Sequence, residues 1–137
     1  ELNKTLNPYD ITKTPGTSSS GSAVVVSTGM VPFALGTQTA GSIIRPASFC
    51  GVWGMKPSYG LIPRTGVLKT SDTLDTIGFL TSHIQNLEII LNSMIVYGEN
   101  YPLVKKKSFK KKFKKKIKNR LFRDWFMQIY CPNIKKK

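Results

Sequence analysis

A stretch of small and apolar residues lies between two turns rich in serine and glycine, and it constrains the fold of this 137-residue chain more than any other feature. The first turn, GTSSSGS, covers residues 16–22, and the second, TAGS, covers residues 39–42. Between them, AVVVSTGMVPFALGTQ predicts a packed helix followed by a buried strand. Such a rigid connection would hold the two serine-bearing turns close together.

The two turns also suggest a chemistry, because a hydroxyl nucleophile needs a neighbouring group that takes its proton. The nucleophile also needs backbone N–H groups that receive the oxyanion formed in the reaction. Serines on tight, glycine-rich turns suit both requirements. Polar linkers have a similar composition, however, so the composition alone leaves both interpretations open.

The valine-rich stretch predicts a buried helix over residues 20–30 in spite of its β-branched side chains. Ser19 or Ser20 can cap the beginning of this helix, and Gly29 can end it. Serine and threonine are its only polar residues, so we expect it to be buried on all sides.

Short apolar runs predict strands over residues 31–36, 52–56 and 77–80. A turn over residues 37–41 follows the first strand, and prolines and glycines indicate a loop over residues 57–76. Strands that alternate with helices are typical of an α/β layer architecture.

The clearest helix is expected over residues 82–97. Ser82 and Gln85 match a capping box at its beginning, and Gly98 lies where a helix would end. Five side chains would form its apolar face, Ile84, Leu87, Leu91, Met94 and Ile95.

The net charge of +14 is confined to the end of the chain. Residues 1–104 carry six basic and six acidic side chains, whereas residues 105–137 carry fifteen basic side chains and one acidic one. We therefore expect a neutral globular segment followed by a lysine-rich tail, which is either helical or disordered. Contact with nucleic acid or an anionic membrane is expected only through the tail.

The remaining residue types exclude several classes of site. Cys50 and Cys131 lie far apart, which argues against a disulfide framework or a zinc site, and Cys50 is expected to be buried. His83 is expected at the surface, and the absence of a G-x-S-x-G motif argues against a Ser-His-Asp triad. Neither a signal peptide nor a transmembrane segment is evident, which favours the cytoplasm.

Two long motifs, TPGTSSSGSAVVVSTGMVPFALGTQTAGSIIRPASFCGVWGMKPSYGLIPRTGV and SDTLDTIGFLTSHIQNLEIIL, resemble the amidase signature family. Motifs of this length are far more specific than a short pattern. The resemblance implies a fragment of an α/β fold, in which helices cover a mixed β-sheet, followed by a basic C-terminal extension. We find no family resemblance beyond Val104, so the partial amidase domain is expected to occupy residues 1–104 and the tail residues 105–137.

Members of this family hydrolyse amide bonds with a Ser–cis-Ser–Lys triad and need no metal or cofactor. The resemblance assigns the acyl-forming nucleophile to Ser42 and the bridging serine, which follows a cis peptide bond, to Ser18. It assigns the oxyanion hole to the backbone N–H groups of four residues, Thr39, Ala40, Gly41 and Ser42. Ser19 matches a further position of the motif, where hydrogen-bond support is expected.

The triad lysine of the family lies well upstream of the first serine-rich turn, on a segment that would precede Glu1. Lys4 and Lys13 are too close to Ser18 in sequence to be its counterpart. Lys56 matches the end of a structural strand of the family. The expectation is therefore a fragment that holds two members of the triad and is inactive alone.

Gln38 and Ala40 stand where many family members have Asp and Gly. With Arg45, the sequence GTQTAGS resembles the malonamidase-like stand-alone amidases, in which an arginine at this position receives a substrate carboxylate. Arg45 could instead pair with a neighbouring structural acid, and the sequence leaves both roles open.

The resemblance thus implies an amidase that cleaves the C–N bond of a small amide through a serine acyl-enzyme. One alternative is the amidase subunit of a tRNA-dependent glutamine amidotransferase, which ranks lower because of the GTQTAGS motif and Arg45. Another is a non-catalytic remnant whose basic tail binds nucleic acid or a membrane surface.

Overall fold

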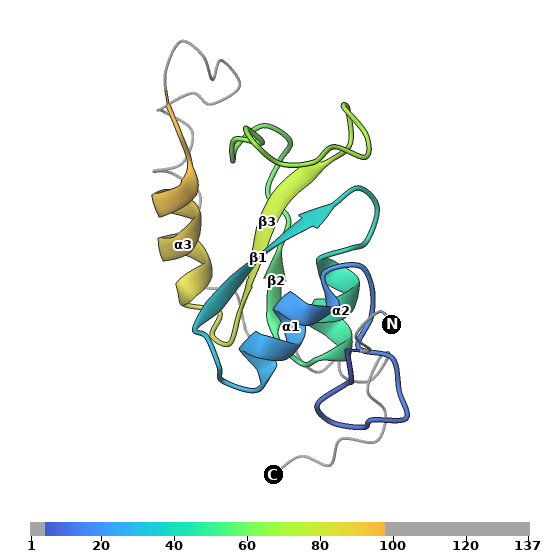
Figure 1. The fold of residues 1–137 in the computed structure, drawn as a ribbon. Coiled ribbons are helices and arrows are strands. Elements are labelled where there is room, and N and C mark those ends of the chain that lie inside the picture. Colours follow the sequence, from blue (N-terminus) through green and yellow to red (C-terminus); the bar gives the residue numbers. More distant parts are fainter. Residues whose placement is uncertain (1–4, 98–137) are drawn as a thin grey trace, which may run out of the picture. The chain divides into compact units, whose positions relative to one another are not determined.

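The computed structural model describes residues 5–97, which form three helices and three strands (Figure 1). In chain order these are α1 (Ser20–Ser27), β1 (Phe33–Gln38), α2 (Ile44–Phe49), β2 (Trp53–Met55), β3 (Thr76–Thr81) and α3 (Asn86–Met94). The expectations for Gly98, Cys131 and the basic tail lie outside the described residues.

The three strands form one sheet in the order β1-β3-β2, with β3 in the centre. Both pairings are antiparallel, and the register places Gly36 opposite Gly78 and Gly54 opposite Leu80. The expectation of a mixed sheet is therefore wrong for the described residues, because β3 runs against both of its neighbours. The α/β character is confirmed.

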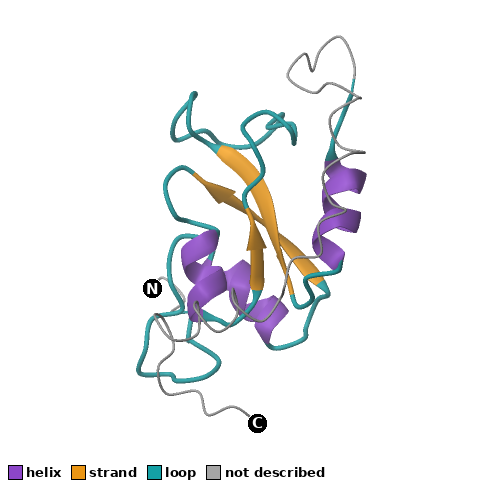
Figure 2. Cartoon of the chain, turned by 180° about the vertical axis from the view of Figure 1, so that it is seen from behind, coloured by secondary structure: helices purple, strands orange, loops and turns teal. Residues whose placement is uncertain are grey.

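Helices α1 and α2 cover one face of the sheet, and in two opposite views the sheet lies between this pair and α3 (Figures 1 and 2). The main core forms where α1 and α2 meet β3. Its buried members are Ala23, Val26, Ile43, Ala47, Cys50 and Leu80. Small side chains on the two helices allow this close approach to the sheet.

Helix α1 confirms the first expected helix but ends three residues earlier, at Ser27 rather than at residue 30. Gly29 follows with a φ of +75°, a conformation that glycine adopts without a steric cost. Only Ala23 and Val26 are buried, so the helix is covered on one side rather than all round. Ser19 precedes the helix without capping it by its side chain, because its hydroxyl donates to the carbonyl of Thr37 instead.

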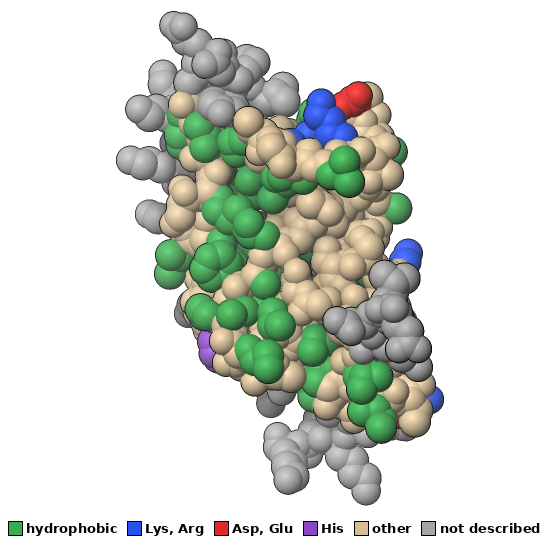
Figure 3. Space-filling view, in the orientation of Figure 1, with side chains coloured by type: hydrophobic (Ala, Val, Ile, Leu, Met, Phe, Trp, Pro, Cys, Tyr) green, Lys and Arg blue, Asp and Glu red, His purple; other side chains and the backbone are tan. Residues whose placement is uncertain are grey.

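Strand β1 begins two residues later than expected and includes Thr37 and Gln38, for which the sequence predicts a turn. Among the described strands it pairs with β3 alone, so within residues 5–97 it is an edge strand and not the buried strand that its apolar sequence predicts. Phe33 and Leu35 are 43% and 53% exposed. Figure 3, drawn in the same orientation as Figure 1, shows hydrophobic side chains at the surface in the region where Figure 1 places β1. The fully buried strand is β3.

Helix α3 confirms the last expected helix over a shorter range, Asn86–Met94. The capping box does not form, because Ser82 lies outside the helix and no side chain caps its first turn. The side-chain amide of Asn86 donates instead to the hydroxyl of Thr81 at 3.2 Å, which ties the helix to the end of β3. Ile95 is already extended, so the helix ends before the expected stop.

Candidate active site

One backbone hydrogen bond joins the two serine-rich turns. The N–H of Ser19 donates to the carbonyl of Ser42 at 3.0 Å. Ser19 directly precedes α1, whereas Ser42 lies two residues before α2. The turns lie close together, as the sequence predicted from the helix and strand between them. The packing of α1 against α2, a helix that the sequence did not predict, also holds them.

The first turn fits tightly against α2. Gly16 has a φ of +81°, and a Cβ atom placed on it would lie 2.7 Å from the Cα of Pro46. Any side chain at this position would therefore push the first turn away from α2. The peptide bond between Thr17 and Ser18 is cis, as the resemblance implies for the bridging serine, and Ser18 is exposed.

The second turn is shaped by the buried side chain of Gln38, at the end of β1. Its amide nitrogen donates to the carbonyl of Ala40 at 2.7 Å. Its amide oxygen accepts the N–H groups of Ile43 and Ile44 at 2.8 and 3.0 Å. One side chain thus closes the turn and satisfies two backbone donors at the beginning of α2.

The backbone donors of this turn remain available. Within residues 5–97, the N–H groups of Ala40, Gly41 and Ser42 donate no hydrogen bond to another protein group. The turn itself is partly exposed. N–H groups that are held in place and not yet used are what an anionic oxygen requires.

Arg45 lies in the first turn of α2 and is exposed. Its guanidinium group covers Gly41, since a Cβ atom on that glycine would lie 3.2 Å from Nη2. In the described part of the chain Arg45 forms no ion pair, and the single ion pair found there joins Lys69 to Asp72. The structural pairing considered for Arg45 thus has no acidic partner among these residues.

Sequence reasoning missed Asp75, the residue directly before β3. Its side chain is 8% exposed and accepts the hydroxyl of Thr39, the first residue of the second turn. That hydroxyl, together with the N–H groups of Ser71 and Thr70, holds the pKa of the Asp75 carboxyl below its usual range. No local signal reveals this contact, because the hydrogen-bonded side chains of Asp75 and Thr39 are 36 residues apart in the chain.

Three other residues lie where the sequence predicts, with Lys56 directly after β2. His83 is exposed, and the Nζ of Lys56 donates to the neighbouring carbonyl of Pro57 at 3.0 Å. Cys50 is fully buried, with its thiol 3.4 Å from the carbonyl of Pro15. None of these side chains makes a hydrogen bond to Ser18 or Ser42 in the described residues.

Burial raises the pKa of the Cys50 thiol to about 11, so native Cys50 should resist alkylation. At pH 8 we expect iodoacetamide to modify it at least about 100-fold more slowly than in the chain unfolded by urea, because the reactive thiolate is scarce and shielded. Mass spectrometry of the peptide that contains Cys50 measures both rates. Equal rates in the two states would contradict this burial.

No group of three or more His, Cys, Asp and Glu side chains in residues 5–97 is arranged to hold a metal ion. None of the helices in this part of the chain has the length and apolar character needed to cross a bilayer.

Comparison with known proteins identifies the family. The sequence pattern of the Amidase family matches residues 2–123, which extends past Val104, where we expected the resemblance to end. The chain belongs to the amidase family, whose members hydrolyse carbon–nitrogen bonds.

The similar proteins include an amidotransferase subunit and a peptide amidase. The chain is 48% identical over 92 residues to a glutamyl-tRNA(Gln) amidotransferase subunit of Staphylococcus carnosus, covering 67% of this chain and 19% of that one. The crystal structure of a Bacillus anthracis amidase family protein superposes with a TM-score of 0.66 at 42% identity, covering 70% of this chain and 19% of that one. Peptide amidase of Stenotrophomonas maltophilia gives 0.67 at 38% identity, covering 71% and 20%.

The covered fractions show how much of a family member the chain contains. It spans about a fifth of the length of the curated relatives that it matches. The described residues are therefore a partial amidase fold that includes both serine-rich turns. We expected the chain to resemble malonamidase-like enzymes more than the amidotransferase subunit. The similar proteins do not support this ranking, because the curated relative above is an amidotransferase subunit.

Proposed function

We propose that this segment supplies the serine centre of an enzyme that hydrolyses the C–N bond of a carboxamide. The observation that carries the proposal is the hydrogen bond from the Ser19 N–H to the Ser42 carbonyl, which joins the two serine-rich turns of an amidase-family chain. Ser42 acts as the nucleophile and Ser18 as the bridging serine. Ser19 supports both turns through its backbone, and its hydroxyl ties the first turn to β1.

The proposed reaction has two steps, formation and hydrolysis of an ester on Ser42. In the first, Ser42 Oγ forms a bond to the carbonyl carbon of the amide, and its proton passes to the Ser18 hydroxyl, which gives up its own proton to the triad lysine. The C–N bond then breaks, and the leaving nitrogen takes a proton along the same route. In the second, water attacks the Ser42 ester, which releases a carboxylic acid and restores the hydroxyl.

The tetrahedral intermediate of each step carries a negative oxygen. The N–H groups of residues 40–42, which donate to no protein group within residues 5–97, lie in a turn that the Gln38 side chain closes, so they need little rearrangement to bind this oxygen. Donors held in place before the reaction stabilise the transition state without a cost of reorganisation. Thr39 completes the set of backbone donors in this proposal.

Arg45 is proposed to bind a negatively charged part of the substrate. It is exposed, its guanidinium group lies over the turn at Gly41, and it has no acidic partner among residues 5–97. A guanidinium group suits two parallel hydrogen bonds to a carboxylate. The favoured substrates are therefore small amides that also carry a carboxylate, as in malonamidase-like enzymes.

The second candidate is the glutamine-hydrolysing step of a tRNA-dependent amidotransferase. It is favoured by the 48% identity to the amidotransferase subunit of Staphylococcus carnosus. Glutamine is itself a carboxamide that carries a carboxylate, so both candidates use the same serine centre and the same Arg45. They differ in whether ammonia is released to solvent or passed to charged tRNA by partner subunits.

The proposal is tested in a full-length amidase-family polypeptide that includes residues 1–137 together with the triad lysine of the family, which we call the lysine-bearing polypeptide. We expect ammonia release from small carboxylated amides and, when hydroxylamine is present, a hydroxamate that reports the acyl-enzyme. Preference for glutamine would favour the amidotransferase candidate. Ammonia release without any hydroxamate would contradict a serine ester intermediate.

A further inference from the structure

Residues 70–72 lie near the end of the loop that connects β2 to β3, and Asp75 holds this segment through its backbone N–H groups. One carboxylate oxygen of Asp75 accepts the N–H groups of Thr70 and Ser71 at 2.6 and 2.8 Å. The other oxygen accepts the hydroxyl of Thr39 at 2.5 Å. Asp75 thus connects the loop to the first residue of the turn that is proposed to bind the oxyanion.

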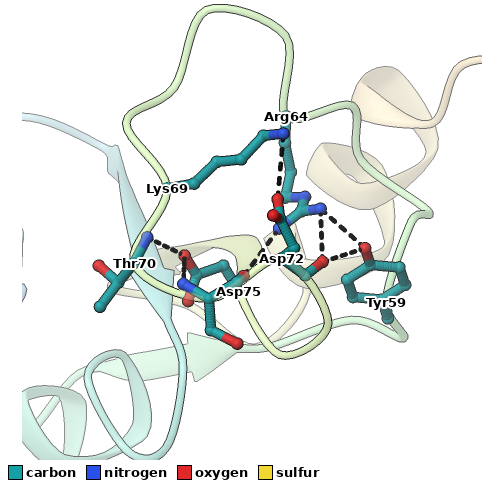
Figure 4. A network of polar contacts seen from close by, with 7 residues as sticks. Tyr59, Arg64, Lys69, Thr70, Asp72 and Asp75 are labelled. Carbon is teal, nitrogen blue, oxygen red and sulfur yellow. Dashed lines mark hydrogen bonds and ion pairs between the residues drawn. The ribbon is translucent and has the colours of Figure 1, made fainter.

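Arg64 holds the same segment on its carbonyl side (Figure 4). Its guanidinium group donates to the carbonyls of Ser71 and Asp72 at 3.2 and 2.8 Å. It also donates to the hydroxyl of Tyr59 at 2.7 Å and lies 4.9 Å from the centre of that ring. The positive charge of Arg64 further favours the ionised form of Asp75. Hydrogen bonds thus hold the loop from both sides, so Asp75 offers Thr39 an acceptor that is itself tied to the loop.

We propose that Asp75 is a positioning residue for amide hydrolysis, and that it acts through the Thr39 hydroxyl to hold the turn of residues 39–42. This inference rests on the proposed function. Hydrogen bonds to an ionised carboxylate are about twice as strong as those between neutral groups. Thr39 is exposed at the beginning of the turn. The side chain of Gln38 holds the carbonyl of Ala40 and the end of the turn near α2, so without Asp75 no side chain within residues 5–97 would hold Thr39.

The first test uses the 137-residue chain itself and measures hydrogen exchange. The amides of Ser19, Ile43 and Ile44 report on the turn, because each takes part in the bonds that close it. We expect these amides to exchange about 10-fold faster in Asp75→Ala and in Thr39→Val, a rise that corresponds to a weakened local closure. Thr39→Val removes only the hydroxyl and leaves the bonds of Asp75 to the loop.

A control variant and a reporter amide distinguish a positioning role of Asp75 from a general loss of stability. Asp72→Ala is the matched control, since the Asp72 side chain pairs only with exposed Lys69, and it should leave the three amides unchanged. The amide of Phe79, a fully buried residue of the central strand β3, reports on unfolding of the whole segment. If the amide of Phe79 exchanges faster by as large a factor as the turn amides, or if the turn amides do not change in Thr39→Val, the inference is wrong.

The second test measures catalysis in the lysine-bearing polypeptide. We expect Asp75→Ala and Thr39→Val each to lower kcat about 10-fold with little change in KM, because donor placement matters most in the transition state. The double variant should lose no more than either single one, since both act through one hydrogen bond. Additive losses, or an Asp75→Ala variant as active as Asp72→Ala, would overturn the inference. Full activity of Ser42→Ala would instead overturn the proposed function.

Discussion

Replacing Ser42 by alanine is expected to reduce kcat/KM for amide hydrolysis on the order of 10⁴-fold or more in the lysine-bearing polypeptide. The substitution removes the oxygen that would form the ester, whereas the turn that carries it is closed by Gln38 and remains in place. The variant should therefore still bind substrate. Ammonia release under single-turnover conditions measures the loss.

Two further variants make this result specific. Ser18→Ala should lose a comparable factor, and the double variant with Ser42→Ala should be no worse, because members of a catalytic triad act as one unit. Ser22→Ala is the matched control, since its hydroxyl only joins α1 to the carbonyl of Leu35 at 2.7 Å. A Ser42→Ala variant with the activity of Ser22→Ala would refute the assignment of the nucleophile.

The sequence was most informative where a feature depends on neighbouring residues or on a long motif. Residues 16–22 and 39–42 were identified because the motif that contains them is long and specific. The helix after Ser19 and the end at Gly29 were expected from small residues and a glycine, and both are present to within a few residues. Burial of Cys50 and exposure of His83 follow from their apolar and polar surroundings.

The rest depends on contacts between distant residues. Helix α2 was missed because it contains Pro46 and has no capping residue of its own, whereas the structure supplies two acceptor contacts from Gln38. Proline is tolerated there because it lies in the first turn of the helix. The hydrogen bond from Thr39 to Asp75 likewise requires the pairing of β1 with β3, which local propensity does not encode.

The fit of Ile43, the neighbour of Ser42, explains how the site is attached to the sheet. Each strand presents a glycine beneath this side chain, and a Cβ atom on Gly36, Gly54 or Gly78 would lie 3.2, 3.3 or 2.8 Å from it. Ile43 is fully buried in the resulting depression. The glycines therefore allow the second turn to lie directly on the sheet.

Gly78→Ala is accordingly expected to lower the free energy of unfolding by about 1–3 kcal/mol or more, the usual cost of overpacking a core. The new Cβ would collide with the carbonyl oxygen of Met55 and with the Cδ1 atom of Ile43. The first collision forces β2 away from β3, and the second lifts the residue next to Ser42. Urea unfolding followed by circular dichroism gives the loss.

Gly21→Ala provides a control of opposite sign. Gly21 lies within α1, and a Cβ atom there would meet no atom within 4 Å, so alanine should stabilise the helix by up to about 1 kcal/mol. Adding Ile43→Val to Gly78→Ala removes the Cδ1 atom and should recover part of the loss, because the contact with β2 remains. If Gly78→Ala is as stable as the original chain, the glycine-lined depression does not determine how the turn is seated.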